Sequence, residues 1–182
     1  SNQIKNYAKT GGNVFGICGG LQMLGESLED PHNKESLKEK SSYSYIGMKL
    51  LPIKTNFVEI KQTSQREEEV LWPEEKIVKG FEMHYGESDL INHKTTDTVS
   101  LFKNSSLGWI LEKKDKSFIG GTYLHGIFQN DEWRQEWINK LRNNKGLNKL
   151  NHNHEKNSLN REKLLDLLTD SFEQNINIEK LI

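Results

Sequence analysis

One cysteine and one distant histidine have the residue types and surroundings that nucleophilic catalysis requires. Cys18, the only cysteine of the chain, lies in NVFGICGGLQMLG between an apolar run and a run with helical spacing. A thiol at a sharp turn from strand to helix is the arrangement called a nucleophile elbow. Gly16, Gly19 and Gly20 permit unusual backbone dihedrals there and leave the approach of a substrate open. Cys18 is therefore the candidate nucleophile.

The start of the following helix adds two features to this turn. The helix dipole favours the thiolate form of Cys18, and the N–H of Gly19 points to where an oxyanion would form. Gln22 lies four residues on, about one helical turn from the thiol. Most lone cysteines are buried core residues, so a catalytic role for Cys18 requires a partner elsewhere in the chain.

His125, in GGTYLHGIF, is the candidate partner. It follows a strand-like run and precedes Gly126, so it can project from a strand end toward Cys18. A cysteine and a histidine that are distant in sequence but adjacent in the fold are typical of acyl transfer sites. A lone histidine is more often a hydrogen-bonded core residue, and the elbow at Cys18 is what favours the catalytic interpretation.

The order of elements around these residues predicts an α/β fold. IKNYAKTGG predicts a helix, NVFGI a buried parallel strand, and the run after Cys18 a helix with Leu21, Leu24 and Leu28 on one face. Because the chain opens on a helix with no strand before it, we expect the N-terminal part of the domain to be absent.

The remainder alternates between strand-like and charged segments. A strand is predicted from about Met48 to Ile60, and a solvated charged loop over residues 66–76. IVKGFEMHYGES predicts another strand, whose pattern Gly80 and Gly86 interrupt. Two further strands are joined by the turn KKDK. NDEWRQEWINKLR predicts an amphipathic helix capped by Asn130 or Asp131. The last predicted helix has an apolar stripe of Leu164, Leu165, Leu168 and Phe172.

Composition excludes several classes of protein. The 182 residues suit one domain, and 25 basic against 26 acidic residues argue against a nucleic-acid surface. There is neither the run of about 20 apolar residues that a membrane helix needs nor a secretion signal. A lone cysteine fits a reducing compartment, so a cytoplasmic protein is expected. HNHE, residues 152–155, has too few ligands for zinc, and no metal is expected.

Three segments resemble, in order, the glutamine amidotransferase domain of cobyric acid synthases: GGNVFGICGGLQMLGESLEDP, GFEMHYGES and GGTYLHGIFQNDEWRQEWIN. The closing REKLLDLLTDSFEQNINIEKLI is similar to the C-terminal helix of that domain, so the resemblance spans nearly the whole chain. It implies a single domain over residues 1–182 with a three-layer, class I glutaminase-like α/β fold. In that fold a sheet is flanked by helices, here apparently without its N-terminal strand or strands.

The resemblance also implies roles for individual residues. Cys18 would attack the carboxamide of glutamine, and His125 would act as general base and then as acid. Gly19 would supply an oxyanion N–H, and Gln22 would help to hold the substrate. His84 matches the family motif E-I-H-M-G and would lie near the substrate, where a binding role and a structural role are both open.

Two positions depart from the patterns of relatives. Class I glutaminases carry H-x-E, with a glutamate that orients the histidine, whereas this chain has Ile127 there. The family variant that the chain resembles also lacks this glutamate. A backbone carbonyl, water or a carboxylate such as Glu82 could hold the imidazole instead. Glu87 stands where many relatives have a basic residue. The reversed charge could alter how the domain binds glutamine or contacts a partner surface.

The resemblance implies a two-domain enzyme that uses L-glutamine. An upstream synthetase domain would use ATP and Mg²⁺ to activate carboxylates of adenosylcobyrinic acid a,c-diamide, and would receive ammonia from this domain. No phosphate-binding loop with GKS or GKT occurs here, so this domain is expected to hold no cofactor and to be a C-terminal fragment. Two alternatives stay open: a glutaminase serving another amidoligase, such as cobyrinic acid a,c-diamide synthase or a peptidoglycan-precursor amidating complex, and a non-catalytic module.

Overall fold

The computed structural model describes residues 2–34, 44–91, 97–150 and 157–175. Its helices are α1 (Asn2–Lys9), α2 (Gly19–Leu24), the 3-10 helix η1 (Ile127–Gln129), α3 (Asp131–Asn144) and α4 (Asn157–Asn175). Its strands are β1 (Val14–Ile17), β2 (Ser27–Glu29), β3 (Ser44–Ile46), β4 (Ile53–Val70), β5 (Lys76–Leu90), β6 (Thr98–Ser100), β7 (Gly108–Glu112), β8 (Phe118–Thr122) and β9 (Leu124–His125).

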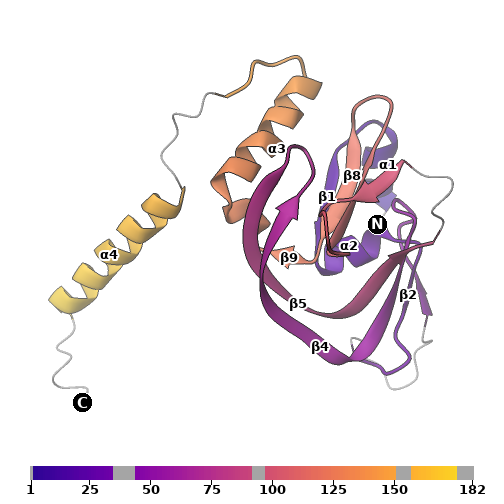
Figure 1. Cartoon of the computed structure of the whole chain (residues 1–182), viewed down its shortest axis with the longest axis horizontal. Helices are drawn as coiled ribbons and strands as arrows, with labels where there is room; N and C mark the ends of the chain where they lie inside the picture. The colour runs from indigo at the N-terminus through magenta and orange to yellow at the C-terminus, as the bar shows by residue number, and fades with distance from the viewer. Residues whose placement is uncertain (1, 35–43, 92–96, 151–156, 176–182) are drawn as a thin grey trace.

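Within the described residues, the strands form two sheets, which confirms the α/β class. One has the order β1-β8-β7-β6, and the other has the order β3-β2-β4-β5-β9. β1 pairs with β8 in parallel, as the apolar run before Cys18 predicts, and β8 is buried along its whole length. β8 and β9 are separated by a single residue, so the chain passes at Tyr123 from the first sheet to the second. Figure 1 shows the long curved β4–β5 hairpin beside α3.

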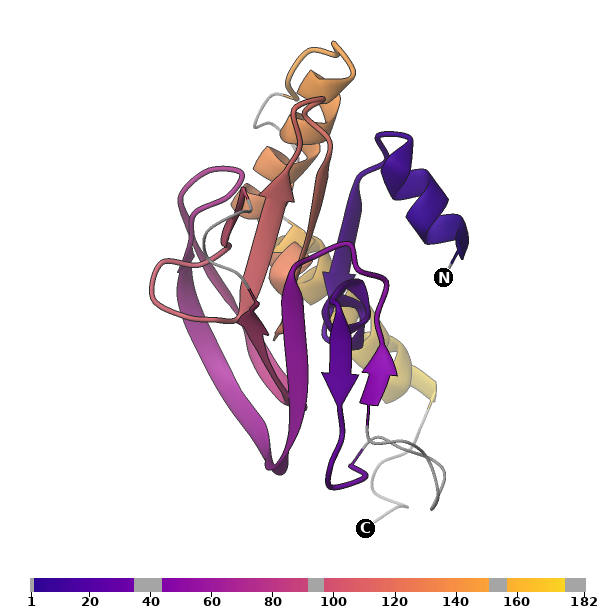
Figure 2. The same cartoon turned by 90° about the vertical axis from the view of Figure 1, so that its right-hand side faces the viewer.

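The prediction of a solvated charged loop was wrong over residues 66–70, which belong to β4. These residues pair in register with residues 76–80 of β5. Two of their charges have partners on other segments: Glu67 binds Lys79 of β5, and Glu69 binds Lys103 after β6, each at 2.9 Å. A strand with charged residues at a sheet surface satisfies its backbone through the ladder and its side chains through such pairs. In Figure 2 this hairpin lies on the side of the molecule opposite α1.

The helix after Cys18 is shorter than predicted, because α2 ends at Leu24 and Leu28 lies in β2. Gly25 follows the helix in an extended conformation, with φ −67° and ψ −178°. The last carbonyls of α2 accept hydrogen bonds from the segment before β4: the Leu50 and Leu51 N–H groups both donate to Leu24 O at 2.9 Å. These tertiary bonds replace the continuation of the helix.

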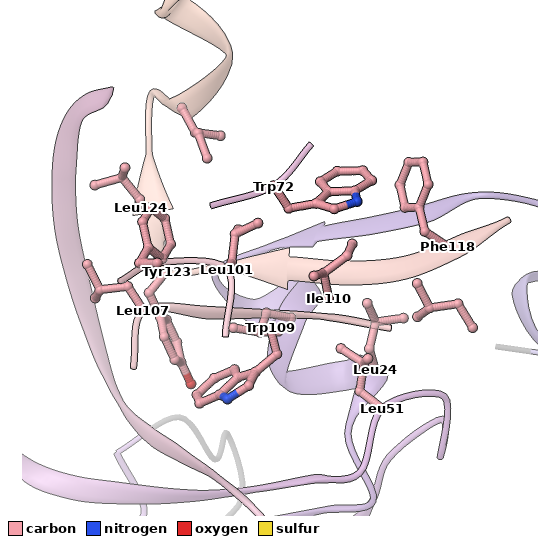
Figure 3. Packing of buried hydrophobic residues seen from close by; sticks show 14 of the residues in the cluster. Leu24, Leu51, Trp72, Leu101, Leu107, Trp109, Ile110, Phe118, Tyr123 and Leu124 are labelled. Carbon is pink, nitrogen blue, oxygen red and sulfur yellow. The ribbon is translucent and has the colours of Figure 1, made fainter. Parts of the chain in front are cut away.

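The buried core includes residues of the first sheet, of α2 and of α3. Figure 3 shows part of this cluster, in which Trp109, Ile110 and Phe118 from β7 and β8 pack with residues of the loops. α3 starts after Asn130, as predicted, and it buries Trp133 completely. The Trp133 indole N–H donates to the carbonyl of Trp72 at 2.9 Å, which satisfies its polar group inside the core.

α4 extends away from the rest of the molecule (Figure 1). The predicted helix is present, but the side chains of its apolar stripe are each more than half exposed. At the other end of the chain, α1 buries only Ala8. The two terminal helices therefore contribute little to the core that supports Cys18.

Candidate functional site

Cys18 occupies the tight turn between β1 and α2 that the sequence predicts. Its backbone has φ +52° and ψ −114°, a conformation that residues other than glycine rarely adopt. Two hydrogen bonds hold the turn: the Cys18 N–H donates to Thr122 O at 2.8 Å, and the Gln22 N–H donates to Cys18 O at 3.2 Å. A strained residue held by its surroundings is typical of a functional site.

The glycines around Cys18 have different functions. A Cβ at Gly16 would lie 2.6 Å from both Gly20 O and the Leu21 N, so only glycine permits the strand to pass this close to α2. A Cβ at Gly19 or Gly20 would meet nothing within 4 Å. A side chain at either position would therefore project into open space.

His125 ends β9 and packs against β5. It stands opposite Phe81 in the β5–β9 ladder, and the two rings stack with centroids 4.9 Å apart and planes 10° from parallel. Its Nε2 atom is buried and has no hydrogen-bond partner among the described residues. A core histidine with a structural role would have that nitrogen satisfied, so this orphan nitrogen favours a chemical role.

The elbow and the histidine border the same short stretch of β5. The Cys18 Sγ lies 3.8 Å from the carbonyl oxygen of Met83 and donates to it. Met83 is two residues along β5 from Phe81, on whose ring His125 stacks. The fold thus places the two predicted catalytic residues, 107 positions apart in sequence, at neighbouring positions along one strand.

Glu82, one of the groups considered for orienting His125, has other partners. Alternate side chains of a strand point to opposite faces, so Glu82 faces away from Phe81 and its stacked imidazole. Its carboxylate accepts from the Arg66 Nε at 2.7 Å and from the Ser64 hydroxyl at 3.2 Å, and it binds His84. The ring of His125 is held by Phe81 instead.

His84 is buried and hydrogen-bonded at both ring nitrogens. Its Nδ1 is 2.7 Å from Gly86 O, and its Nε2 is 2.9 Å from the carboxylate of Glu82. Both neighbours, a backbone carbonyl and a carboxylate, are hydrogen-bond acceptors. One face of the ring stacks on Tyr123 with centroids 3.8 Å apart. The protein itself therefore engages both polar atoms of His84.

The ion pairs of Glu82 predict a pH-dependent contribution to stability. Burial raises the pKa of Glu82. The hydrogen bonds and charges of Arg66 and then His84 together lower it by more, so the pKa lies below the ordinary 4.5. A lowered native pKa stabilises the fold above the unfolded value, and this contribution is lost as the pH falls through the native pKa. Glu82→Gln is expected to lower the free energy of unfolding by about 1–3 kcal/mol at neutral pH, with a smaller difference below pH 4.5.

Urea unfolding at neutral pH and at acid pH measures this difference. The matched control is Glu67→Gln, which removes an exposed carboxylate paired with Lys79 and is expected to cost about 0–1 kcal/mol. A difference between wild type and Glu82→Gln that is the same at both pH values would show that the carboxylate pairing does not stabilise the fold.

Gln22 points into a buried polar network behind the elbow. The carboxamide lies against Gly86, where an added Cβ would overlap its Nε2 atom. The Tyr123 hydroxyl is 2.6 Å from the Ser88 hydroxyl, which is 2.7 Å from that of Thr55. Sequence reasoning missed Tyr123, although it stands two residues before His125 in the motif.

A cavity of about 490 Å³ adjoins this network on the β4–β5 side. Glu87, the position that departs from relatives, lies in its wall together with Gln62, Arg66, Glu82, His84, Ser88, Asp89, Asn104, Ser105, Ser106, Leu107 and Tyr123. Neither Cys18 nor His125 lines it.

The described residues contain no group of three or more metal-binding side chains, and HNHE lies outside them. None of the helices searched in the described ranges is long and apolar enough to cross a membrane.

Comparison with known proteins decides the family. Residues 1–133, which contain both Cys18 and His125, match the model of the CobB/CobQ-like glutamine amidotransferase domain. The chain belongs to this family. The glutamine amidotransferase domain therefore includes the elbow, β5 with its Glu82–His84 pair, and the β8–β9 segment.

Curated relatives of this amidotransferase domain are named cobyric acid synthase. Three of them, all from Prochlorococcus marinus, are 72% identical in strain NATL2A, 70% identical in strain NATL1A and 41% identical in strain MIT 9313, each over 182 residues. Each match covers 100% of this chain, but only 36%, 37% and 36% of the respective relative. The chain thus spans little more than a third of the length of these relatives.

Proposed function

We propose that this domain hydrolyses glutamine at Cys18 and His125 and supplies ammonia for an ATP-dependent amidation. The observation that carries the proposal is that a strained cysteine elbow and an unsatisfied histidine both contact β5, Cys18 at Met83 and His125 at Phe81. Membership of the glutamine amidotransferase family supplies the substrate class.

The chemistry follows from the positions of these groups. His125 accepts the Cys18 proton, and the thiolate attacks the carboxamide carbon of glutamine. The N–H of Gly19 stabilises the oxyanion. His125 then returns the proton to the departing nitrogen, so that ammonia leaves and a γ-glutamyl thioester remains. Water hydrolyses the thioester to glutamate, with His125 again as base, and Gln22 helps to hold the amino acid.

The acceptor of the ammonia is inferred from the names of the relatives. Because they are named cobyric acid synthase, we infer that the ammonia serves amidation of adenosylcobyrinic acid a,c-diamide in cobalamin synthesis. A synthetase domain of the same enzyme would bind this corrinoid and use ATP and Mg²⁺ to activate its carboxylates. The share of the relatives that lies outside this match leaves room for such a domain.

Active-site labelling tests the glutaminase proposal directly. The native full-length chain is incubated with a glutamine-mimicking diazoketone, and its intact mass is compared with that of Cys18→Ala. We expect a single adduct on the wild type, suppressed by excess glutamine, and none on the variant, because Cys18 is the proposed nucleophile. An unlabelled wild type, or an adduct that persists in Cys18→Ala, would favour a non-catalytic module.

A further inference from the structure

We propose that Thr122 is a positioning residue that decides where His125 lies relative to Cys18. Its carbonyl oxygen accepts a hydrogen bond from the Cys18 N–H at 2.8 Å. Its hydroxyl accepts a hydrogen bond from the N–H of Leu124, the residue before His125, at 2.9 Å. Thr122 thus holds the elbow through its backbone and the histidine segment through its side chain. The inference rests on the proposed glutaminase function and adds a residue to it.

Thr122 stands where the chain leaves the first sheet for the second. It is the last residue of β8, and it lies opposite Ile17, the last residue of β1, in the parallel ladder. Cys18 follows directly after Ile17. Two residues beyond Thr122, Leu124 already belongs to the β5–β9 ladder, and His125 ends β9. The conformation of this short crossing therefore determines where the imidazole lies.

The Thr122 hydroxyl fixes the crossing with two buried hydrogen bonds. It donates to Leu107 O at 3.0 Å and accepts from the Leu124 N–H. A hydroxyl bonded to the backbone two residues on is a common means of fixing a turn. Figure 3 shows Leu107 and Leu124 beside Tyr123 in the buried cluster. Thr122 is 0% exposed, so bulk water does not compete for its hydroxyl, and hydrogen bonds in such surroundings are stronger than at the surface.

The backbone of β5 also confines the histidine segment. A Cβ at Gly80 would lie 2.2 Å from His125 O and 2.8 Å from the Leu124 Cγ, so β9 abuts a position without a side chain. Next to it, the imidazole stacks on Phe81. This confinement matters because a general base must come within about 2.6–3.2 Å of the atom whose proton it accepts. A misplacement of about 1 Å can cost about 100-fold in rate.

Two substitutions of Thr122 in the native full-length chain test the inference. Thr122→Val keeps the shape of the side chain and removes the hydroxyl, whereas Thr122→Ser keeps the hydroxyl. In Thr122→Val the Leu107 carbonyl still accepts from the Tyr123 N–H, which lies 2.7 Å away in the wild type. The Leu124 N–H, in contrast, loses the partner that the hydroxyl provides. Steady-state glutamine hydrolysis is measured at a temperature at which circular dichroism shows every variant to be folded.

Thr122→Val is expected to lower kcat about 10–100-fold with little change in KM, because the base is displaced while the glutamine pocket remains. Thr122→Ser is expected to recover most of this loss. The matched control is Thr98→Val, at a buried threonine whose hydroxyl has no hydrogen-bond partner among the described residues. Its kcat should equal that of the wild type.

A double-mutant cycle with His125 separates positioning from a general loosening of the fold. In the His125→Phe background, Thr122→Val should not lower the remaining rate further, because the imidazole that Thr122 positions is gone. An equal further loss in that background overturns the role of Thr122 alone. So does a Thr122→Val variant with the kcat of the wild type, or a Thr122→Ser variant as slow as Thr122→Val.

The remaining outcomes keep this inference distinct from the proposed function. A wild type without glutaminase activity overturns the proposed function and this inference with it. If Thr122→Val does not fold, Gly80→Ala displaces the same segment, because the added methyl group would overlap His125 O. That variant is expected to lower kcat, and an unchanged kcat would contradict the proposal.

Discussion

Replacement of His125 by phenylalanine is expected to lower kcat for glutamine hydrolysis by about 10²–10⁴-fold, the range for loss of a general acid–base. The same variant is expected to be as stable as the wild type or more stable. Phenylalanine can stack on Phe81 as the imidazole does, and it removes the buried Nε2 atom that has no partner among the described residues. Leaving such an atom unsatisfied costs about 1–3 kcal/mol.

This opposition between stability and activity is the reason to measure both. Glutamate release gives the rate, and urea unfolding gives the free energy. His32→Asn is a suitable control because His32 is exposed and pairs with Glu59 at the surface, so neither quantity should change. A His125→Phe variant that retains the wild-type rate would remove His125 from the mechanism, and one destabilised by more than about 2 kcal/mol would assign it a structural role.

Gly16→Ala is expected to have the second large effect, on the fold and on the thiol together. The added methyl group would lie 2.6 Å from Gly20 O and the Leu21 N, where backbone cannot yield easily. Overpacking of this kind costs about 1–3 kcal/mol. Because Gly16 is two residues from Cys18, the displacement of α2 from β1 would also disturb the elbow and slow the chemistry.

Gly20→Ala is the matched control for stability. It adds the same methyl group on the other side of Cys18, where a Cβ meets nothing within 4 Å, and alanine favours the helical backbone of α2. Thermal unfolding should separate the two variants, with Gly16→Ala less stable and Gly20→Ala close to wild type. Equal melting temperatures would show that the β1–α2 contact is not tight.

The features that sequence alone determined are those encoded over a few neighbouring residues. The glycines around Cys18 indicated the elbow, and the apolar run before it indicated a parallel strand. The spacing in the segment after Asn130 indicated α3 with Trp133 on its buried face. Such patterns depend on local steric limits and helical or strand periodicity, which the chain carries wherever it folds.

Contacts between distant segments decided the rest. Nothing in residues 66–70 shows that their charges would lie along a strand, because their partners are 76–80 of β5 and Lys103. Leu28 has helical spacing, yet the hydrogen bonds from residues 48–51 end α2 before it. In each case a favourable local pattern was overridden by backbone pairing that only the assembled sheets provide.

The candidate site shows the same division. Sequence identified Cys18 and His125 by residue type and motif, but it left open which groups surround the imidazole. The structure places Phe81 against His125 and directs Glu82 to Arg66 and His84 on the opposite face of β5. Side-chain partners depend on strand register and on which face each residue occupies, and both are set only when β5 pairs with β4 and β9.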